Sequence, residues 1–303
     1  MTAAPAAPIS TSARTFIYGL ADDEGRLDTE FLYAAAAAAG FTTTKLRLAI
    51  RRMAEARLLR STGRGRSATT RLTPAGIADR SPELAWVGAA YRADAGLDEW
   101  DGRWHLAAFE IPEEQRLARD AVRTHLLDLF GAPISGGLYV SPLAWEPWIL
   151  RLASSRGVPD RITLIETDSL THAGYTHPAD VAAVLWPVRE IHTGYRSFFD
   201  EWGARVDAVP DDPLEALRFA FDAAHEFELV FRRDPLLPRP LVPDDFAGPP
   251  ARRLFLDLLD ALSDHPELAD ASLFHSYRNA VDRALAQDEG EFWRLVFEET
   301  SAR

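Results

Sequence analysis

The stretch from Lys45 to Ser67 constrains the fold most, because it passes abruptly from a helical pattern to a turn. Its first half carries apolar residues at helical spacing and predicts a helix with one apolar stripe: Leu46, Ala49, Ile50, Met53 and Ala56. Gly63 and Gly65 then predict a turn between two short strands at 58–61 and 69–73. Eight of the 23 residues are Lys or Arg and only Glu55 is acidic, so this helix and turn are strongly basic.

Two more helices are expected before the basic one, at residues 13–20 and 27–39. Asp28 is a suitable N-cap for the second of these helices, and Gly40 suits its C-terminal end. The hydroxyl groups of Thr42–Thr44 suit the N-cap of the basic helix. Three helices followed by a basic hairpin have the order of a winged helix-turn-helix, which we predict for the N-terminal part of the chain.

A second unit of alternating strands and helices is expected in the middle of the chain. Three strands and two helices are predicted there from periodicity, namely strands Trp104–Phe109, Ile134–Val140 and Arg161–Thr167, and helices Glu113–Leu129 and Trp145–Arg156. The order strand–helix–strand–helix–strand over about 65 residues indicates an α/β sandwich of the ferredoxin-like type.

From Pro178 onward the pattern is mostly helical, apart from the proline-rich segment RRDPLLPRPLVP, which cannot form a regular helix. The helices are predicted at Asp180–Trp186, Ile191–Trp202, Pro213–Arg232, Pro250–Ser263, Ser272–Leu285 and Glu289–Thr300. The overall prediction is an α+β protein. It comprises a disordered leader at 1–12, a winged helix domain at 13–80, a helical connector at 81–99, a ferredoxin-like domain at 100–177 and a helical domain at 178–303.

The charge of the chain is divided unevenly along its length. The net charge is −13, yet residues 1–80 contain 12 Lys and Arg against 7 Asp and Glu, a balance of +5. The remainder therefore carries −18. A basic end on an acidic body indicates an anionic partner for that end alone.

Composition also excludes several classes of protein. There is no cysteine, which rules out disulfides, thiolate metal sites and a cysteine nucleophile. No apolar run reaches the roughly 18–20 residues of a membrane span. The N-terminal sequence MTAAPAAPIS lacks the basic and apolar regions of a signal peptide. We therefore expect a cytoplasmic protein without a membrane partner.

A recognition helix places its N-terminal residues in the major groove of DNA, where Thr and Arg side chains meet base edges and phosphates. Arginines of the following hairpin would reach a neighbouring phosphate strand or the minor groove. The residues predicted to bind DNA are Thr42, Thr43, Thr44, Lys45, Arg47, Arg51, Arg52, Arg64, Arg66 and Arg71. A basic helix face alone is also typical of a solvated surface, but the basic hairpin that follows it favours double-stranded DNA.

Signatures of enzymes are missing from the sequence, including G-x-S-x-G, H-E-x-x-H and the P-loop. We therefore predict no catalytic residue, no metal and no cofactor. His172 and His177 lie near Asp168 and Asp180, but an exposed polar loop explains these residues better than a metal site. Glu110 is read as a surface carboxylate. The aromatic residues of the middle unit are expected in its core, and a pocket for an aromatic or acyl ligand is the alternative.

Three groups of motifs, in the same order along the chain, resemble the PaaX family of phenylacetic acid degradation repressors. The first group runs from Arg47 to Gly76 and is similar to the recognition helix and wing of the family. The second comprises WDGRW at 100–104, the segment FEIPEEQRLAR, and GGLYVSP at 136–142. The third comprises RRDPLLP at 232–238 and LVPDDFAG at 241–248. The resemblance covers residues 13–265.

The resemblance implies a transcriptional regulator that binds operator DNA through the winged helix and forms a homodimer through its helical domain. The middle domain would be similar to a CRISPR spacer-acquisition subunit. The best-known members are repressors released by phenylacetyl-CoA, so we expect a small effector such as an aryl-CoA thioester, and control of an aromatic or acyl-CoA catabolic operon. Arginines suit the phosphates of an acyl-CoA, and the residues predicted to bind the effector are Trp104, Trp145, Arg189, Arg232 and Arg233.

Two other functions stay open from the residues themselves. One is a metal-dependent nuclease or hydrolase built on the middle domain. The other is an adaptor that uses the basic N-terminal module to bind RNA.

Overall fold

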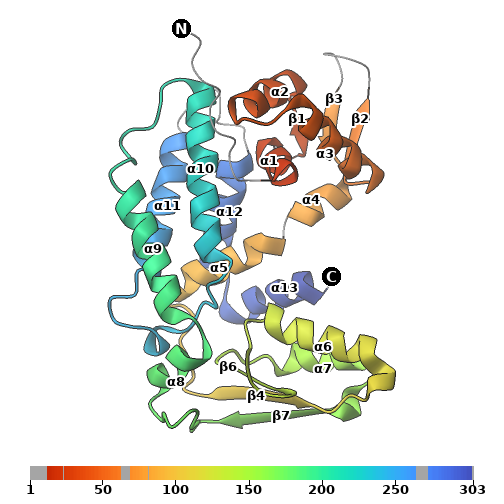
Figure 1. The fold of residues 1–303 in the computed structure, drawn as a ribbon, viewed down its shortest axis with the longest axis vertical. Helices are drawn as coiled ribbons and strands as arrows, with labels where there is room; N and C mark the ends of the chain where they lie inside the picture. The colour runs from red at the N-terminus through yellow and green to blue at the C-terminus, as the bar shows by residue number, and fades with distance from the viewer. Residues whose placement is uncertain (1–11, 23, 63–68, 81, 264–271, 302–303) are drawn as a thin grey trace. The chain divides into compact units, whose positions relative to one another are not determined.

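The computed structural model describes residues 12–22, 24–62, 69–80, 82–263 and 272–301 (Figure 1). The chain forms two compact units, each assembled from separate segments. Unit 1 contains Met1–Tyr91, Gly194–Arg232 and Ala247–Ala286, and unit 2 contains Arg92–Thr193, Arg233–Phe246 and Gln287–Arg303. Because each unit joins segments that are far apart in the sequence, the units do not test the domain boundaries predicted along the chain, which stay predictions. Helices predominate and both sheets are antiparallel, in agreement with the predicted α+β class.

The N-terminal part of unit 1 has the predicted order of three helices and a hairpin. The elements are α1 (Ala13–Leu20), α2 (Thr29–Ala38), α3 (Thr43–Glu55), β2 (Leu59–Thr62) and β3 (Thr69–Leu72). A short strand that the pattern does not predict, β1 (Arg26–Leu27), pairs with β3. It completes a three-stranded antiparallel sheet in the order β1-β3-β2.

Capping side chains explain where α2 and α3 begin. Asp28 accepts a hydrogen bond from the backbone N–H of Phe31 at 2.9 Å, and Thr42 accepts one from the N–H of Lys45 at 3.2 Å. Both predicted caps are therefore confirmed. Each cap satisfies one of the backbone donors that a helix leaves unpaired at its N-terminus.

The apolar stripe of α3 is only partly buried. Leu46 and Met53 are in the core, Ala49 and Ile50 are half-buried, and Ala56 is exposed. The two buried side chains, two turns apart, therefore hold the helix against its neighbours.

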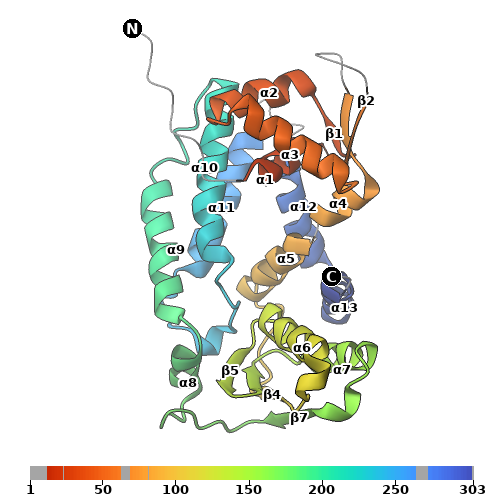
Figure 2. The ribbon, with the colours of Figure 1, turned by 45° about the vertical axis from the view of Figure 1, so that its right-hand side comes forward.

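The remainder of unit 1 is helical. It comprises α4 (Pro74–Arg80), most of α5 (Pro82–Asp94), the last turns of α9 (Val188–Trp202), α10 (Pro213–Phe231), α11 (Gly248–Ser263) and α12 (Ser272–Ala286). Helices α10 and α11 lie side by side in Figures 1 and 2. The rings of Phe227 and Phe255 stack with centroids 4.1 Å apart, and Phe198 meets both edge-on. Helices α8 to α13 all lie within one turn of the predicted bounds.

The early and late helices of unit 1 share one core. The ring centroid of Phe16 in α1 lies 5.0 Å from that of Phe41 and 4.6 Å from that of Phe221 in α10. All three rings are buried. Arg218 of α10 also donates a hydrogen bond to the carbonyl of Ala38, the last residue of α2, at 3.4 Å. Helix α10 therefore closes the core of the three N-terminal helices.

Unit 2 is built on a four-stranded antiparallel sheet in the order β5-β6-β4-β7. Strands β4 (Trp104–Phe109) and β7 (Ile162–Thr167) lie where strands are predicted. Strand β4 pairs with β6 on one side and with β7 on the other. It is therefore one of the two central strands, and its first four residues are all buried.

The single strand predicted at Ile134–Val140 is wrong. The chain instead forms a hairpin of β5 (Ala132–Ser135) and β6 (Leu138–Ser141). Gly137 has a φ of +80°, and a Cβ there would lie 2.8 Å from the carbonyl oxygen of Phe109. Because only glycine fits this turn, the chain reverses within a run that otherwise has strand character.

Helices cover the sheet of unit 2, with α6 and α7 lying along one face (Figure 2). The elements are η2 (Glu113–Gln115), α6 (Arg116–Asp128), α7 (Glu146–Ser155), η3 (Pro159–Arg161), α8 (Pro178–Leu185), the first turns of α9, η4 (Arg239–Leu241) and α13 (Glu289–Ser301). The helix predicted from Glu113 thus starts with a 3₁₀ turn. Trp104 is buried and stacks on Trp186 with centroids 6.3 Å apart.

A buried arginine joins the end of α5 to the C-terminal helix of unit 2. Arg92 donates to both carboxylate oxygens of Asp98, at 2.8 and 2.9 Å, and to the carbonyl of Gln287 at 2.7 Å. Its guanidinium also lies 4.7 Å from the ring centroid of Phe292 in α13. The charge is buried but fully engaged, as burial of an ion requires.

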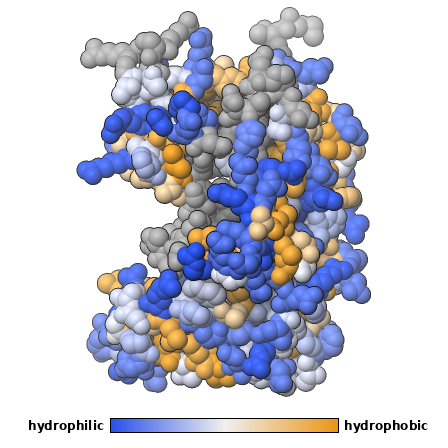
Figure 3. All heavy atoms as spheres, turned by 180° about the vertical axis from the view of Figure 1, so that it is seen from behind, coloured by the Kyte–Doolittle hydropathy of each residue, from blue (hydrophilic) through white to orange (hydrophobic). Residues whose placement is uncertain are grey.

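The face seen in Figure 3 is mostly hydrophilic, with smaller apolar areas between the polar side chains. Isolated exposed side chains such as Leu117 and Ile165 are common on protein surfaces and need no partner to explain them. Among the described residues, no helix combines the length and the apolar composition needed to cross a membrane.

Gly131 and Gly136, on either side of β5, give a matched test of packing in unit 2. A Cβ on Gly131 would collide with the ring of Trp145 and lie 2.7 Å from the carbonyl oxygen of Leu126, whereas a Cβ on Gly136 meets nothing within 4 Å. We expect Gly131→Ala to lower the free energy of unfolding by about 1–3 kcal/mol. Chemical denaturation of both variants measures this, and equal effects of Gly131→Ala and Gly136→Ala would contradict the packing around Trp145.

Candidate nucleic-acid interface and ligand cleft

The N-terminal turn of α3 is fully presented to solvent. Thr42, Thr43, Thr44 and Lys45 are all exposed. The ammonium of Lys45 lies 4.7 Å from the ring centroid of Phe41, which holds the stem of this side chain near the start of the helix. Hydroxyl and ammonium groups can donate hydrogen bonds to phosphate oxygens. The backbone N–H groups at the N-terminus of a helix attract the same anions.

The arginines that follow in α3 are also exposed. Arg47, Arg51 and Arg52 lie off the buried stripe. Arg51 forms an ion pair with Glu55 one turn later at 3.6 Å, with both side chains about two-thirds exposed. An exposed pair of this kind contributes little to stability, so Arg51 can exchange Glu55 for another anion at small cost.

The turn before α3 is built as a tight connection between two packed helices. Gly40 has a φ of +78°, and the N–H of Phe41 bonds to the carbonyl of Ala36 at 2.8 Å. Phe41 itself is buried. Helices α2 and α3 are therefore joined by a tight turn, and the arginines of α3 face outward.

The three-stranded sheet aligns arginines that sequence reasoning did not bring together. Arg71 of β3 pairs in register with Arg60 of β2 on one side and with Arg26 of β1 on the other. All three side chains are exposed. Arg26 was missed because β1 was not predicted. Arg60 lies in a predicted strand, and the register of that strand with β3 would have placed it beside Arg71. Arg64 and Arg66 lie outside the described residues.

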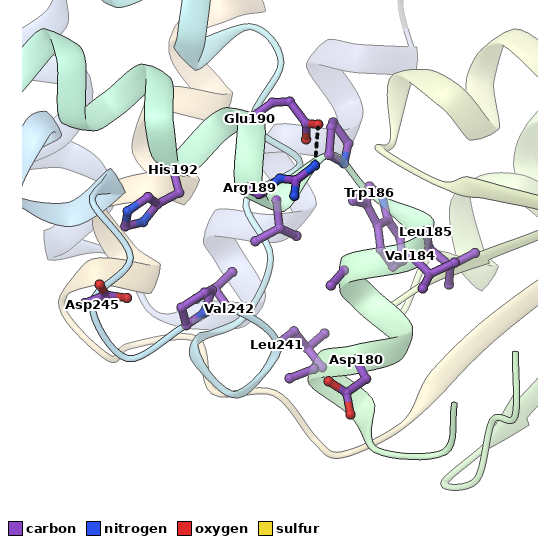
Figure 4. A pocket seen from close by; sticks show the side chains of 15 residues that line it. Asp180, Val184, Leu185, Trp186, Arg189, Glu190, His192, Leu241, Val242 and Asp245 are labelled. Atoms are coloured by element: carbon purple, nitrogen blue, oxygen red, sulfur yellow. Dashed lines mark ion pairs between the residues drawn. The ribbon is translucent and has the colours of Figure 1, made fainter. Parts of the chain in front are cut away.

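A separate cleft of about 850 Å³ lies within unit 2 (Figure 4). Its walls come from α8, the first turns of α9 and the segment from η4 to Asp245. Apolar side chains such as Val184, Trp186 and Leu241 line it. The volume is in the range of small-molecule sites.

The charged groups around the cleft are mainly acidic. Asp180, Glu190 and Asp245 line it together with Arg189 and His192. The side chain of Arg189 is 91% exposed, and its guanidinium is 3.9 Å from the carboxylate of Glu190 (Figure 4). The cleft therefore offers one guanidinium beside an apolar wall.

Of the residues predicted to bind an effector, only Arg189 lines the cleft. Trp104 and Trp145 are buried in the core of unit 2. Arg232 ends α10 in unit 1 and pairs with Glu228, and its neighbour Arg233 is exposed at the start of a segment of unit 2. The five predicted residues therefore do not line one common site.

Comparison with models of protein families shows to which family the chain belongs. The model of the PaaX protein central Cas2-like domain matches residues 97–182, and the model of the PaaX-like protein C-terminal domain matches residues 186–269. Together the two models cover more than half of the 303 residues. The chain belongs to the PaaX family.

Among curated proteins, the transcriptional repressor PaaX of Escherichia coli (strain K12) is 26% identical over 176 residues. The match spans 55% of this chain and 54% of that protein, so about half of the curated relative is covered. Among solved structures, the uncharacterized protein Rv0674 from Mycobacterium tuberculosis is similar over 84% of this chain and 91% of that chain. The TM-score is 0.50 and the identity 22%, which supports a common fold alone.

The PaaX-type motifs form turns in this structure. In WDGRW, Asp101 accepts a hydrogen bond from the N–H of Arg103 at 2.8 Å, Gly102 has a φ of +79°, and the indole of Trp100 donates to the carbonyl of Arg103. This turn leads directly into β4. The motif therefore sets the start of a central strand of unit 2.

The proline-rich motif after α10 is organised by a buried carboxylate. Asp234 accepts a hydrogen bond from the N–H of Leu236 at 2.9 Å, and Leu236 has a φ of +52°. Such Asx turns stabilise a backbone conformation that a leucine rarely adopts alone. The PaaX-type Asp-Pro pair thus shapes the start of the segment that leads to η4.

Proposed function

We propose that this PaaX-family chain is a DNA-binding transcriptional repressor in which α3 is the recognition helix of a winged helix-turn-helix. The observation that carries the proposal is the exposed basic face of α3, set behind a tight turn and followed by the hairpin β2–β3. The curated relative is named a transcriptional repressor, which supports the same reading.

Electrostatics favours one docking orientation. The first 80 residues carry a balance of +5 and the remainder −18. Phosphates attract the basic part and are repelled by the acidic part, so only the α3 face can approach DNA closely. Phosphate contacts would position the helix, and Thr43, Thr44 and Arg47 would read base edges.

The middle sheet is proposed to be ferredoxin-like. Its elements follow the order β4, α6, β5, β6, α7, β7, which is the β-α-β-β-α-β sequence of that motif. The strand order β5-β6-β4-β7 places the first and third strands of the motif at the centre. This part is proposed to be a scaffold and not a nuclease.

The repressor is proposed to act as a homodimer. Two recognition helices related by a two-fold axis would read two half-sites, so the operator would be approximately palindromic. A footprint of the promoter region beside the gene would show two protected half-sites of similar sequence.

Reversing charge on α3 tests the DNA-binding surface. We expect the double variant Arg47→Glu, Arg51→Glu to bind the promoter DNA more than tenfold more weakly, because each lost contact costs about 1–3 kcal/mol and 1.4 kcal/mol is a factor of ten. Fluorescence anisotropy with duplex DNA at fixed salt measures this.

The matched control is Arg116→Glu, Arg123→Glu on α6, which changes the net charge equally in unit 2. It is expected to keep most of the affinity, and circular dichroism should show both variants folded. Normal DNA binding by the α3 variant would refute the assignment of the recognition helix. A preference for single-stranded RNA over duplex DNA would instead favour the adaptor function.

The cleft of unit 2 is proposed to receive the effector, an aryl-CoA thioester produced by the aromatic catabolic operon under control. Its apolar wall suits the aryl group, and Arg189 suits an anionic group at the rim. The carboxylates of Asp180, Glu190 and Asp245 disfavour phosphates inside the cleft. The nucleotide part of the effector would therefore extend into solvent.

A thermal-shift series tests this proposal. Phenylacetyl-CoA should raise the midpoint temperature of unfolding more than CoA or phenylacetate alone, because it fills both the apolar and the charged parts of the cleft. A ligand at a hundredfold excess over its Kd stabilises the native state by about 2.7 kcal/mol. Arg189→Ala should reduce the shift and Arg156→Ala, away from the cleft, should not. The absence of a shift with all three compounds would rule out this class of effector.

A further inference from the structure

A histidine and three carboxylates converge beside β4 of unit 2, and none of them lines the cleft. His105 of β4 is directly opposite Glu166 of β7 in the strand register, so both side chains lie on the same face of the sheet. Glu146, in the first turn of α7, reaches the same point. His105, Glu146 and Glu166 each present a nitrogen or oxygen atom within 4.8 Å of the others.

One nitrogen of this histidine is held and the other is left open. The Nδ1–H of His105 donates to the carboxylate of Glu146 at 2.7 Å. With the proton on Nδ1, the neutral ring carries its lone pair on Nε2. Nε2 is buried and has no hydrogen-bond partner among the described residues. Since buried nitrogen atoms are nearly always paired, this one needs an explanation.

The open nitrogen faces another carboxylate. Nε2 of His105 lies 3.6 Å from Oδ2 of Asp101, which is too long for a hydrogen bond. Two ligands bound to one tetrahedral ion are separated by roughly 3.3–3.5 Å, as follows from bond lengths of about 2.0–2.2 Å. The WDGRW turn fixes Asp101 in this position, because its other carboxylate oxygen accepts the N–H of Arg103.

The net negative charge around His105 also favours a bound cation. Asp101, Glu146 and Glu166 surround the ring, and Arg103 pairs with Oε2 of Glu166 at 3.1 Å. Three carboxylates and one guanidinium leave a formal charge of minus two around a neutral imidazole. Burial opposes protonation of His105, but the hydrogen bond and charge of Glu146 and the charges of Asp101 and Glu166 outweigh it and raise the pKa of His105.

We propose that this cluster is a binding site for a divalent transition-metal ion of the zinc or manganese type. Nε2 of His105 and the carboxylate of Asp101, 3.6 Å apart, are the first two ligands. Glu166 is opposite His105 in the strand register, and its half-exposed carboxylate is the third ligand once the side chain turns toward the ion. Glu146 holds the ring through Nδ1, the arrangement of a carboxylate–histidine–metal triad. One imidazole with carboxylates suits Zn²⁺ or Mn²⁺, whereas Mg²⁺ prefers oxygen ligands and retained water.

The ion would join three pieces of unit 2. The ligands come from the turn before β4, from β4 itself and from β7, and the orienting carboxylate comes from α7. Asp101 and Glu166 are each about half exposed, so an ion can reach the site from solvent. Its role is to stabilise the sheet, which makes the stability of unit 2 dependent on metal supply.

Isothermal titration calorimetry of the full chain, first stripped with a chelator, tests the proposal with Zn²⁺ and, separately, with Mg²⁺. We expect one equivalent of Zn²⁺ to bind and Mg²⁺ to bind far more weakly. Asp101→Asn and Glu166→Gln should each weaken Zn²⁺ binding by at least tenfold, the scale on which loss of a coordinating or supporting group acts. Both positions are half exposed, so these variants should fold even if His105→Gln does not.

The matched control is Glu114→Gln, which neutralises an exposed carboxylate of the same unit in η2. It should bind Zn²⁺ as the unmodified chain does. Failure of the unmodified chain to bind Zn²⁺ stoichiometrically would overturn the proposal and leave a proton as the only cation of the cluster. Equal Zn²⁺ affinity in Asp101→Asn, Glu166→Gln and Glu114→Gln would place the ion elsewhere and overturn it too.

Discussion

The contact between Phe16, Phe41 and Phe221 is the interaction on which the presentation of the basic helix depends. Phe41 stands in the turn immediately before α3, and Phe221 comes from α10, far along the chain. Three N-terminal helices alone would leave this ring cluster open to water. Burying aromatic rings contributes several kcal/mol, so α10 supports the geometry of the turn between α2 and α3. For the proposed recognition helix α3, this contact is a physical route from the later helix α10 to DNA binding.

Strand β4 has the corresponding role in unit 2. Side chains alternate between the two faces of a strand, so adjacent residues of β4 make contacts on opposite sides of the sheet. Trp104 packs into the core against Trp186, while His105 turns to the opposite face among Glu146, Asp101 and Glu166. The WDGRW motif therefore does more than begin a strand. Its turn also fixes the carboxylate of Asp101 beside the open nitrogen of His105.

Local signals were readable before the structure, and non-local ones were not. Helix bounds and the caps Asp28 and Thr42 follow from interactions within one turn of the chain, so residue pattern was enough. The hairpin at Gly136–Gly137 was missed because a two-residue turn inside an apolar run leaves strand character on both sides. Strand β1 was missed because two residues carry no period, and its pairing with β3 depends on the whole sheet.

The sequence by itself determined the family motifs, the order of helices and strands, and the concentration of positive charge in the first 80 residues. These depend on short spacings and on composition, which folding does not change. Only the tertiary structure decided that α10 completes the N-terminal core and that three arginines align across a sheet. It also decided that His105 meets Glu146 and Glu166, with Asp101 3.6 Å from its Nε2. Such contacts join residues many positions apart, and their geometry is set by packing of the whole unit rather than by any local pattern.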